Sequence, residues 1–418
     1  MITDTFAGLL GLAIAACLFL ARFLGDGPED TPSFVACTVA AFALYAAALR
    51  LLPDSPTPER RQGRLLLVAI IAVVVHIAPF RGKPVRDTDA YRYHWDGMVL
   101  ARGLNPYQHA PEAPELRAVR DEFYDPMDYK SVKTIYPPLT QAVLAATYFA
   151  DPTPRRALVL AMVGNLLCLW PLAILLRRHR VGLRWLAAYG WNPLLAVEFA
   201  TGGHLDPLSV MLLLWALVLL GSDRPIAAGV MLALAILSKT QILVVTPVLA
   251  RRLGWRGITI TAIVCTAAVA PFVATGGDLL AGAGAYMAHW EFNSGLYALA
   301  KWAMGSAGAR ALAAFVVVTV VTWLALAGAD PVDACGLALG ALLLVSPAVF
   351  PWYLSWVLPF ACLRRSVTGL VASLALLASH FHQMSVALGK LLRWPEYALI
   401  AGAAAVELWR RRSTPSRG

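Results

Sequence analysis

The chain has 418 residues, of which 59% are hydrophobic and 14% charged, and its mean hydropathy is +0.64. Soluble domains carry about 25% charged residues, so most of this chain cannot face water. The formal net charge of +10 comes from short arginine clusters between apolar runs, which argues against nucleic acid as a partner. The six cysteines lie in or beside apolar runs without paired spacing, so neither a disulfide nor a metal cluster is expected.

The apolar runs predict an all-α, polytopic transmembrane protein with about 11–14 spans, forming a single domain over residues 1–418. Several runs are shorter than the ~20 residues that a straight crossing needs. Those around Lys239 and around Ser346-Pro347 are expected to be broken or re-entrant helices that line a cavity. In chain order the predicted spans cover about residues 6–24, 33–50, 64–80, 156–176, 183–202, 206–221, 225–238, 240–252, 257–275, 310–327, 333–347, 351–363, 366–383 and 395–409.

The arginine clusters indicate how the chain is oriented in the membrane. All of them lie on the cytoplasmic side if the N-terminus is cytoplasmic. The segment 81–151 then forms a first outer loop with a juxtamembrane helix, provided that residues 139–150 form a helix at the outer surface instead of crossing. The clusters are Arg60-Arg61-Arg64, Arg177-Arg178-Arg180-Arg184, Arg251-Arg252-Arg256, Arg364-Arg365 and Arg410-Arg411-Arg412.

The outer loop contains the most distinctive motifs. It opens with DTDAYRYHWDG at residues 87–97, continues with GLNPY at 103–107 and ends with IYPPL at 135–139. Apolar and aromatic residues recur at helical spacing after the two aspartates, which predicts an amphipathic helix lying on the bilayer. Asp87 and Asp89 are expected at the outer end of the third span, where partial desolvation makes a carboxylate more basic.

The two aspartates have other possible roles. Either Asp87 or Asp89 could cap the juxtamembrane helix. Two aspartates separated by one residue also form the metal-binding motif of nucleotide-sugar transferases, but this sequence predicts no Rossmann-like domain to accompany it.

The order of the motifs resembles the bacterial polytopic glycosyltransferases of the C-type superfamily, above all the mannosyltransferase-like branch that uses polyprenyl-phosphate sugars. Two departures are Thr88-Asp89, where family members often have two adjacent acidic residues, and Leu205, where a polar residue is common. Further matches follow in the family's order: WNP at 191–193, GHLD at 203–206, LSK at 237–239, HWEFN at 289–293, SP at 346–347 and PWY at 351–353.

The resemblance implies an inverting hexosyltransferase with a first-loop aspartate as general base. The donor would be a polyprenyl-phosphate sugar, with mannose favoured, and the acceptor a glycan, a glycolipid or a protein. The enzyme would be a multi-pass protein of the bacterial inner (cytoplasmic) membrane, with its active site on the outer face. In the family pattern a tyrosine follows the base by four residues; Asp89 with Tyr93 fits this pattern in the right register, so Asp89 is the predicted base and Asp87 the second candidate.

Fixed cations are needed to stabilise the departing lipid phosphate. The candidates are Arg92, Lys239 and His289, and no metal or other cofactor is expected because these cations can take its place. Lys239 is the most informative, since an ionisable residue inside an apolar run costs about 2.5–3.5 kcal/mol to insert. The alternatives are that Lys239 reaches the outer interface with its ammonium group and that His289 is a surface residue beside an interfacial tryptophan.

The predicted substrate-binding residues are Tyr93, Tyr136, His204 and Asp206. His204 and Asp206 could cap the helix that begins there, bind sugar or support Asp89, and capping by Asp206 is the expected use. The alternative function is a transporter or flippase of lipid-linked sugars, although such proteins usually show inverted repeats that this sequence lacks. A structural subunit without chemistry of its own is a third possibility.

Overall fold

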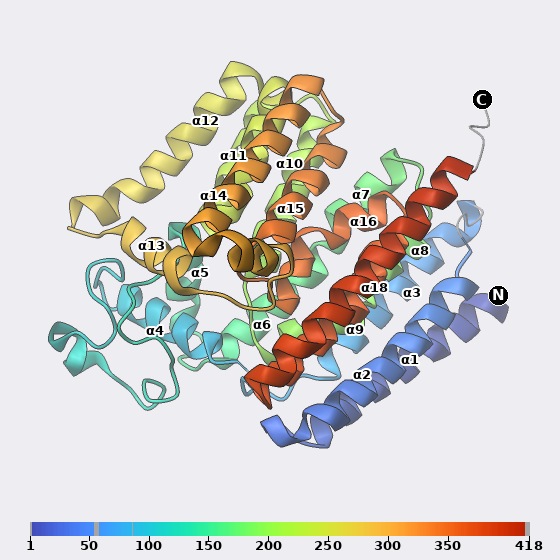
Figure 1. Cartoon of the computed structure of the whole chain (residues 1–418), viewed down its shortest axis with the longest axis horizontal. Coiled ribbons are helices and arrows are strands. Elements are labelled where there is room, and N and C mark those ends of the chain that lie inside the picture. Colours follow the sequence, from blue (N-terminus) through green and yellow to red (C-terminus); the bar gives the residue numbers. More distant parts are fainter. Residues whose placement is uncertain (1, 54–57, 86, 414–418) are drawn as a thin grey trace.

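The computed structural model describes residues 2–53, 58–85 and 87–413, in which helices are joined by turns and loops (Figure 1). Within these ranges five helical segments are long and apolar enough to cross a membrane. The all-α, polytopic membrane fold expected from the sequence is thereby confirmed. The five segments are Thr3–Phe23, Pro28–Leu51, Arg155–Arg178, Thr240–Ala274 and Leu296–Ala327, and shorter apolar helices cover Asp206–Leu220, Pro225–Ser238 and Pro331–Val345.

The α-helices in chain order are α1 (Ile2–Phe23), α2 (Thr31–Leu51), α3 (Pro58–Ile77), α4 (Asp89–Ala101), α5 (Pro138–Tyr148), α6 (Arg155–Leu167), α7 (Leu169–Arg178), α8 (Arg184–Gly190), α9 (Pro193–Thr201), α10 (Asp206–Leu220), α11 (Pro225–Ser238), α12 (Thr246–Ala274), α13 (Leu279–His289), α14 (Leu296–Ala327), α15 (Pro331–Val345), α16 (Leu358–Leu363), α17 (Val367–Ala375) and α18 (Val386–Ser413). Short 3-10 helices are η1 (Pro28–Asp30), η2 (Pro114–Val119), η3 (Thr240–Val245), η4 (Pro351–Trp356) and η5 (Leu376–Gln383).

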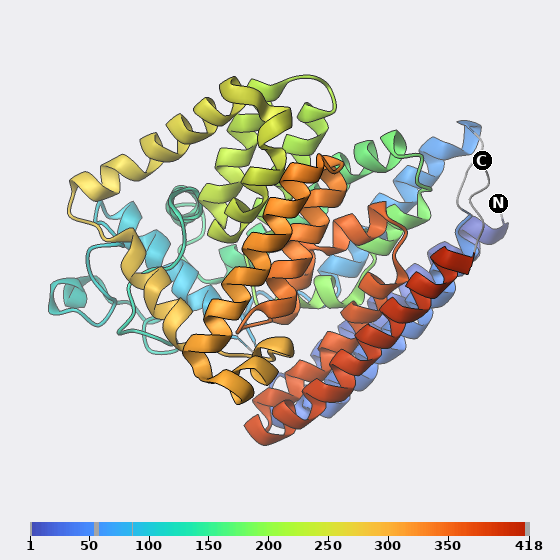
Figure 2. The same cartoon turned by 45° about the horizontal axis from the view of Figure 1, so that its top comes forward.

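The bundle has two different ends. The start of α1 and the end of α18 lie at one end, and α4, α13 and the loop after α4 lie at the other (Figure 1). In sequence-adjacent pairs, α1 packs on α2, α10 on α11, α11 on α12 and α14 on α15. Figure 2 shows the red helix α18 running alongside the blue pair α1 and α2.

Two helix breaks lie where the sequence predicts them. Helix α11 ends at Ser238, and Lys239 is extended, with φ −151° and ψ 114°, before η3 begins. Helix α15 ends at Val345, and Ser346 is extended, with φ −65° and ψ 139°. Pro347 disfavours helical geometry in the residue before it, which explains the second break. Irregular backbone of this kind is tolerated in a membrane protein when it lines a cavity.

Helix α12 is divided by Gly254, whose φ is 59°. A positive φ suits glycine because it has no Cβ. The division falls between the two spans predicted for residues 240–252 and 257–275.

Helix α4 is enclosed by protein, so the expectation that it lies on the bilayer as an amphipathic helix is wrong. Trp95, Met98 and Val99 pack with Leu116 and Met127 of the following loop. On another side, a Cβ added at Gly97 would lie 2.7–2.8 Å from atoms of Leu144, so α4 and α5 are in close backbone contact.

The two aspartates were expected at the outer end of the third span, but α3 already ends at Ile77. Asp89 is the first residue of α4, and Asp87 lies two residues before it. Helix α5 has 11 residues, which is too short for a crossing. Its length agrees with the expectation that residues 139–150 do not span the membrane.

The predicted orientation can be tested by cysteine labelling of intact cells. Glu112→Cys, at an exposed position of the loop after α4, should react with a membrane-impermeant maleimide because the positive-inside rule places this loop outside. His179→Cys, exposed in the turn after α7, should react only after the cells are permeabilised. The unmodified chain gives the background from the native cysteines. Labelling of position 179 but not 112 in intact cells would reverse the orientation.

Candidate active site

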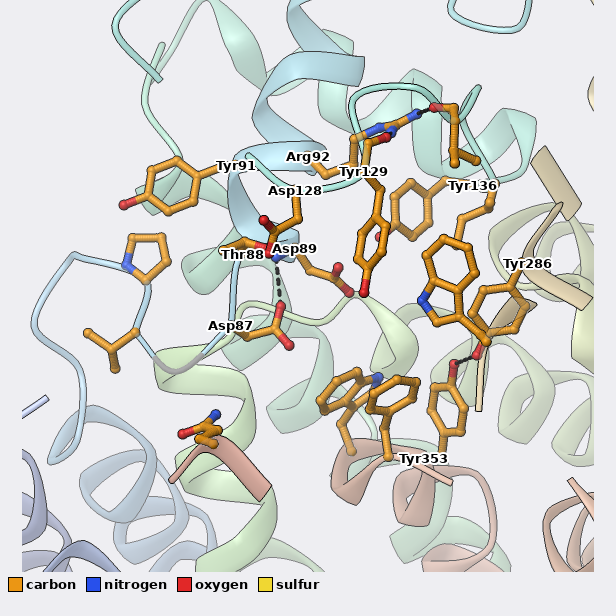
Figure 3. A pocket seen from close by; sticks show the side chains of 18 of the residues that line it. Asp87, Thr88, Asp89, Tyr91, Arg92, Asp128, Tyr129, Tyr136, Tyr286 and Tyr353 are labelled. Atoms are coloured by element: carbon orange, nitrogen blue, oxygen red, sulfur yellow. Dashed lines mark hydrogen bonds between the residues drawn. The ribbon is translucent and has the colours of Figure 1, made fainter. Parts of the chain in front are cut away.

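A cavity of about 630 Å³ lies at the α4 end of the bundle (Figure 3). Its walls come from the start of α4, the loop before α5, the break at Lys239, the end of α13 and the segment around η4. Five predicted site residues, Asp87, Asp89, Arg92, Tyr136 and Lys239, line it. The other chemically relevant lining residues are Thr88, Tyr91, Asp128, Tyr129, Tyr286, Trp290, Phe350, Trp352 and Tyr353.

The two aspartates are used differently. Asp87 Oδ1 accepts a hydrogen bond from the backbone N–H of Asp89 at 2.6 Å, so Asp87 supports the first turn of α4. Thr88 is the N-cap residue, but its hydroxyl donates to Asp128 at 2.8 Å instead of capping the helix. Neither aspartate is the N-cap residue, so the capping role considered for them is not observed, although Asp87 binds the N–H of the first helical residue. Asp89 is the first residue of α4, and its carboxylate faces the cavity (Figure 3).

His204 lies between the two carboxylates. Its side chain is buried, with Nδ1 3.4 Å from Asp89 Oδ2 and Nε2 4.0 Å from Asp87 Oδ2. The ring stacks on Trp352, with centroids 3.4 Å apart and planes 8° apart. Gly203 (φ 73°) makes the left-handed turn after α9 that brings His204 there. Of the roles considered for His204, support of Asp89 is the one that this geometry favours.

Burial and charge set the protonation of this cluster. Burial raises the pKa of Asp87, the neighbouring charge of Asp89 raises it further, and the pKa reaches about 7. Burial acts in the same direction on Asp89, but hydrogen bonding and charge from His204 outweigh it and bring the pKa below its usual range. Burial disfavours the charged form of His204, yet both aspartates together raise its pKa. At neutral pH the arrangement therefore favours an ionised Asp89 beside an imidazolium.

The same three residues could hold a divalent cation. One ligand atom from each of Asp87, Asp89 and His204 lies within 4.8 Å of the others. Carboxylate oxygen and imidazole nitrogen are common ligands of transition metals. The two aspartates also raise the pKa of His204, which favours positive charge between the carboxylates without a metal. The metal-free site expected from the sequence stays a prediction.

Lys239 and Asp206 form a buried ion pair. Lys239 Nζ lies 3.0 Å from Asp206 Oδ1 and donates to Oδ2 at 3.1 Å. Trp356 Nε1 donates to Asp206 Oδ1 at 2.7 Å. The cap position of α10 is Leu205 and no side-chain cap bond forms there, so the capping role expected for Asp206 is wrong. Its carboxylate turns to Lys239 because a lysine buried in the bundle needs a counter-charge.

The side chain of Lys239 is largely buried at the cavity wall. Its side chain is 14% exposed, and Nζ lies 5.2 Å from the Tyr353 ring and 5.7 Å from the Trp356 ring. The ammonium group is held at the cavity wall between a carboxylate and two aromatic faces.

Arg92 holds the loop that covers the cavity. Its Nε donates to Asp96 at 3.0 Å, Nη1 to the carbonyl of Tyr129 at 3.3 Å and Nη2 to the carbonyl of Val132 at 2.9 Å. Three of its N–H donors are thus used within the protein, which indicates a positioning role, and phosphate binding by Arg92 stays a prediction.

Tyr129 is a site residue that the sequence did not indicate. Its φ is 53°, a conformation unusual for a bulky side chain and often found at functional sites. Its ring points toward Asp89 (Figure 3), and its centroid lies 4.4 Å from that of Trp290. A left-handed tyrosine has no local sequence signal, because the loop is fixed by the bonds from Arg92.

Four of the predicted residues do not line the main cavity. Tyr93 is buried behind Tyr136, with ring centroids 4.4 Å apart, and its hydroxyl accepts the N–H of Leu205 at 3.4 Å. Tyr93 thus supports the cavity wall from behind, through its contacts with Tyr136 and Leu205. His204 and Asp206 act through the residues described above. A fourth, His289, is exposed at the end of α13 outside the cavity lining, whereas its neighbour Trp290 lines the cavity.

The fold and the cavity define a polytopic membrane protein with a carboxylate-containing site at one end of its helical bundle. Residues 11–256 match a family model described as Alpha-(1->6)-mannopyranosyltransferase, N-terminal domain, and residues 281–410 match one described as MptB C-terminal domain. The first match covers more than half of the chain, so the protein belongs to the alpha-(1->6)-mannopyranosyltransferase family.

The protein is therefore a glycosyltransferase, and its resemblance to polytopic C-type mannosyltransferases is confirmed. This sets aside the transporter and structural-subunit alternatives. Both matched regions contribute to the cavity: Asp87, Asp89 and Lys239 come from the first, and Trp290 and Tyr353 from the second. No curated protein and no solved structure matches the chain.

Removing one partner of the Lys239–Asp206 pair should destabilise the protein. Lys239→Met leaves the fully buried Asp206 carboxylate without its cation, at an expected cost of about 3–5 kcal/mol. The expected result is a lower apparent Tm in detergent, measured by intrinsic fluorescence. Lys239→Met combined with Asp206→Asn should regain most of that loss.

Lys301→Met is the matched control, because the Lys301–Glu291 pair is largely exposed, at 42% and 32%, and should contribute little. A double variant as unstable as Lys239→Met alone would show that the ion pair is not the source of the effect.

Proposed function

We propose that this enzyme transfers mannose from a polyprenyl-phosphate sugar to an acceptor hydroxyl on the outer face of the membrane, with Asp89 as general base. The acceptor would be a glycan, a glycolipid or a protein, and the outer loop 81–151 would carry the catalytic motif. Family membership supports mannosyl transfer. The donor class, the role of Asp89, the inversion and the side of the membrane are the proposal.

The position of Lys239 between two adjoining hollows carries the proposal. The polar cavity holds Asp87 and Asp89, and beside it lies a groove of about 360 Å³. Lys239 contributes to the lining of both. The groove is lined mostly by apolar and aromatic residues: Ile135, Tyr136, Pro137, Leu243, Val244, Ala283, Tyr286, Met287, Leu342 and Tyr353.

This groove suits an amphiphilic donor. Leu243 and Met287 are 57% and 63% exposed, as expected for side chains that face lipid. A prenyl chain lying there would place its phosphate beside Lys239 and its sugar in the polar cavity. A water-soluble nucleotide sugar would have no use for an apolar groove at this point, which favours a lipid-linked donor.

The proposed reaction is a single displacement. The acceptor oxygen attacks C1 of the sugar while Asp89 takes the hydroxyl proton. The bond from C1 to the phosphate oxygen breaks on the opposite face, and the polyprenyl phosphate leaves with its new negative charge beside Lys239. His204 keeps Asp89 ionised before the reaction. Since a single displacement inverts C1, an α-linked product requires a β-linked donor.

Asp89→Asn is expected to abolish mannosyl transfer while leaving the apparent Tm close to that of the unmodified enzyme. The amide has the shape of the carboxylate but cannot accept the proton, and loss of a general base typically costs about 10²–10⁴-fold in rate. Purified enzyme with polyprenyl-phosphate mannose and an acceptor glycan gives the rate. Asp128→Asn, a control at another carboxylate of the cavity wall, should lose much less.

The dependence of the transfer rate on pH also tests whether Asp89 or Asp87 is the general base. With the pKa of Asp89 below its usual range, the base stays ionised and the rate should persist as the pH falls from 7 to about 5. Because the pKa of Asp87 is about 7, an acid limb with its midpoint there, together with an inactive Asp87→Asn variant, would assign the base to Asp87.

Activity should survive a strong chelator. His204 and Lys239 provide fixed positive charge beside the carboxylates and the proposed phosphate position, which removes the need for a cation. Lys239→Met removes the positive charge beside the proposed phosphate position and should therefore raise the KM for the donor. Chelation should raise this KM less. Loss of activity in EDTA that magnesium or manganese restores would instead make Asp87, Asp89 and His204 metal ligands.

A further inference from the structure

A second large cavity lies between α2, α8, α17 and α18, away from the candidate active site. Its volume is about 620 Å³. Three arginines, Arg50, Arg184 and Arg410, contribute to its lining, and the described lining contains no acidic residue. The remaining lining is apolar or aromatic: Val39, Phe42, Ala43, Tyr45, Ala46, Leu49, Trp185, Ala188, Val367, Leu370, Val371 and Leu374.

The three arginines that contribute to the lining lie at or near helix ends. Arg50 and Arg410 lie in the last turns of α2 and α18, and Arg184 is the first residue of α8. The ends of α2 and α18 lie at the terminal end of the bundle, opposite α4 (Figure 1). The cavity therefore has a cationic mouth at this end, and its apolar walls extend from the mouth into the bundle.

The length of the walls fits one membrane leaflet. Along α2 the lining extends from Val39 to Arg50, which at 1.5 Å per residue is about 16 Å. The hydrocarbon core of a bilayer is about 30 Å thick, so the cavity matches an acyl chain of a single leaflet. Tyr45 donates its hydroxyl to the carbonyl of Ala188, so this polar group of the wall is already satisfied inside the protein.

Charge decides which lipid fits. Three guanidinium groups contribute to one end of the cavity lining, and the described lining residues are otherwise apolar or aromatic. A phosphate with net negative charge would add charge-assisted hydrogen bonds to the arginines there. Basic pockets between membrane helices on the cytoplasmic side bind anionic head groups in this way.

We propose that this cavity binds an anionic glycerophospholipid of the leaflet opposite the candidate active site. Its phosphate lies between Arg50, Arg184 and Arg410, and its acyl chains lie against α2 and α17. The site is independent of the transfer reaction and of its donor.

The test uses the full chain, purified in detergent and depleted of lipid, with phosphatidylglycerol in mixed micelles as the probe. Binding is measured by native mass spectrometry and by the rise in apparent Tm. Phosphatidylglycerol should bind and stabilise, whereas phosphatidylcholine and inorganic phosphate should not. Arg50→Gln, Arg184→Gln and Arg410→Gln combined should weaken phosphatidylglycerol binding about 100-fold.

Two further variants distinguish a lipid inside the cavity from one held by surface charge. Arg252→Gln with Arg412→Gln removes exposed arginines outside the cavity lining and should leave binding unchanged. Ala46→Trp keeps the three arginines, fills the apolar walls and should abolish binding.

Several results would overturn the proposal. One is equal binding of phosphatidylcholine, and another is binding that the triple variant retains. Binding that survives Ala46→Trp would show adsorption to surface charge instead of a cavity. Copurification of polyprenyl phosphate in place of a glycerophospholipid would assign the cavity to another lipid.

Discussion

The ion pair between Lys239 and Asp206 joins the break after α11 to the start of α10, and much of the candidate site depends on it. A charge buried in an apolar bundle must be paired, since an isolated one costs several kcal/mol. Here the pair holds the end of α11 in place, and Trp356 from η4 completes it by donating to Asp206. Three segments far apart in the sequence are thereby joined at the cavity wall.

The same requirement applies to the cluster of Asp87, Asp89 and His204. His204 is buried between Asp87 and Asp89, so one imidazole ring lies near both carboxylates of this cluster. The arrangement is uneven, because the backbone N–H of Asp89 binds Asp87 while the closer histidine nitrogen faces Asp89. Two aspartates separated by one residue consequently have pKa values displaced in opposite directions, which allows them different chemical roles.

The two ends of the bundle offer different surroundings to lipids. At the α4 end, the groove beside Lys239 leads from exposed apolar side chains to the carboxylates. At the terminal end, arginines surround the mouth of a cavity whose walls are apolar. A donor lipid at one end and an anionic structural lipid at the other would occupy opposite leaflets. The arginines would then have two functions, in topology and in lipid binding.

The membrane class, the helical fold, the two helix breaks and the family could all be predicted from the sequence, because hydropathy, proline and motif order are local properties of the chain. The sequence also identified Asp87, Asp89 and Lys239, which the structure brings to one cavity. The partners of these residues emerged only in the folded bundle. Asp206 was expected to cap its helix, but it pairs with a lysine 33 residues away.

The burial of α4 and the left-handed Tyr129 likewise follow from long-range contacts. The first depends on packing against α5 and the loop, and the second on hydrogen bonds from Arg92 to carbonyl groups 37 and 40 residues further along the chain. His289 and Trp290 are adjacent in sequence, yet only Trp290 lines the cavity. The sequence pattern determined which segments are helical and which motifs belong together. The pairing of buried charges and the direction of each side chain required the folded bundle, because a charge needs a partner only once it is buried.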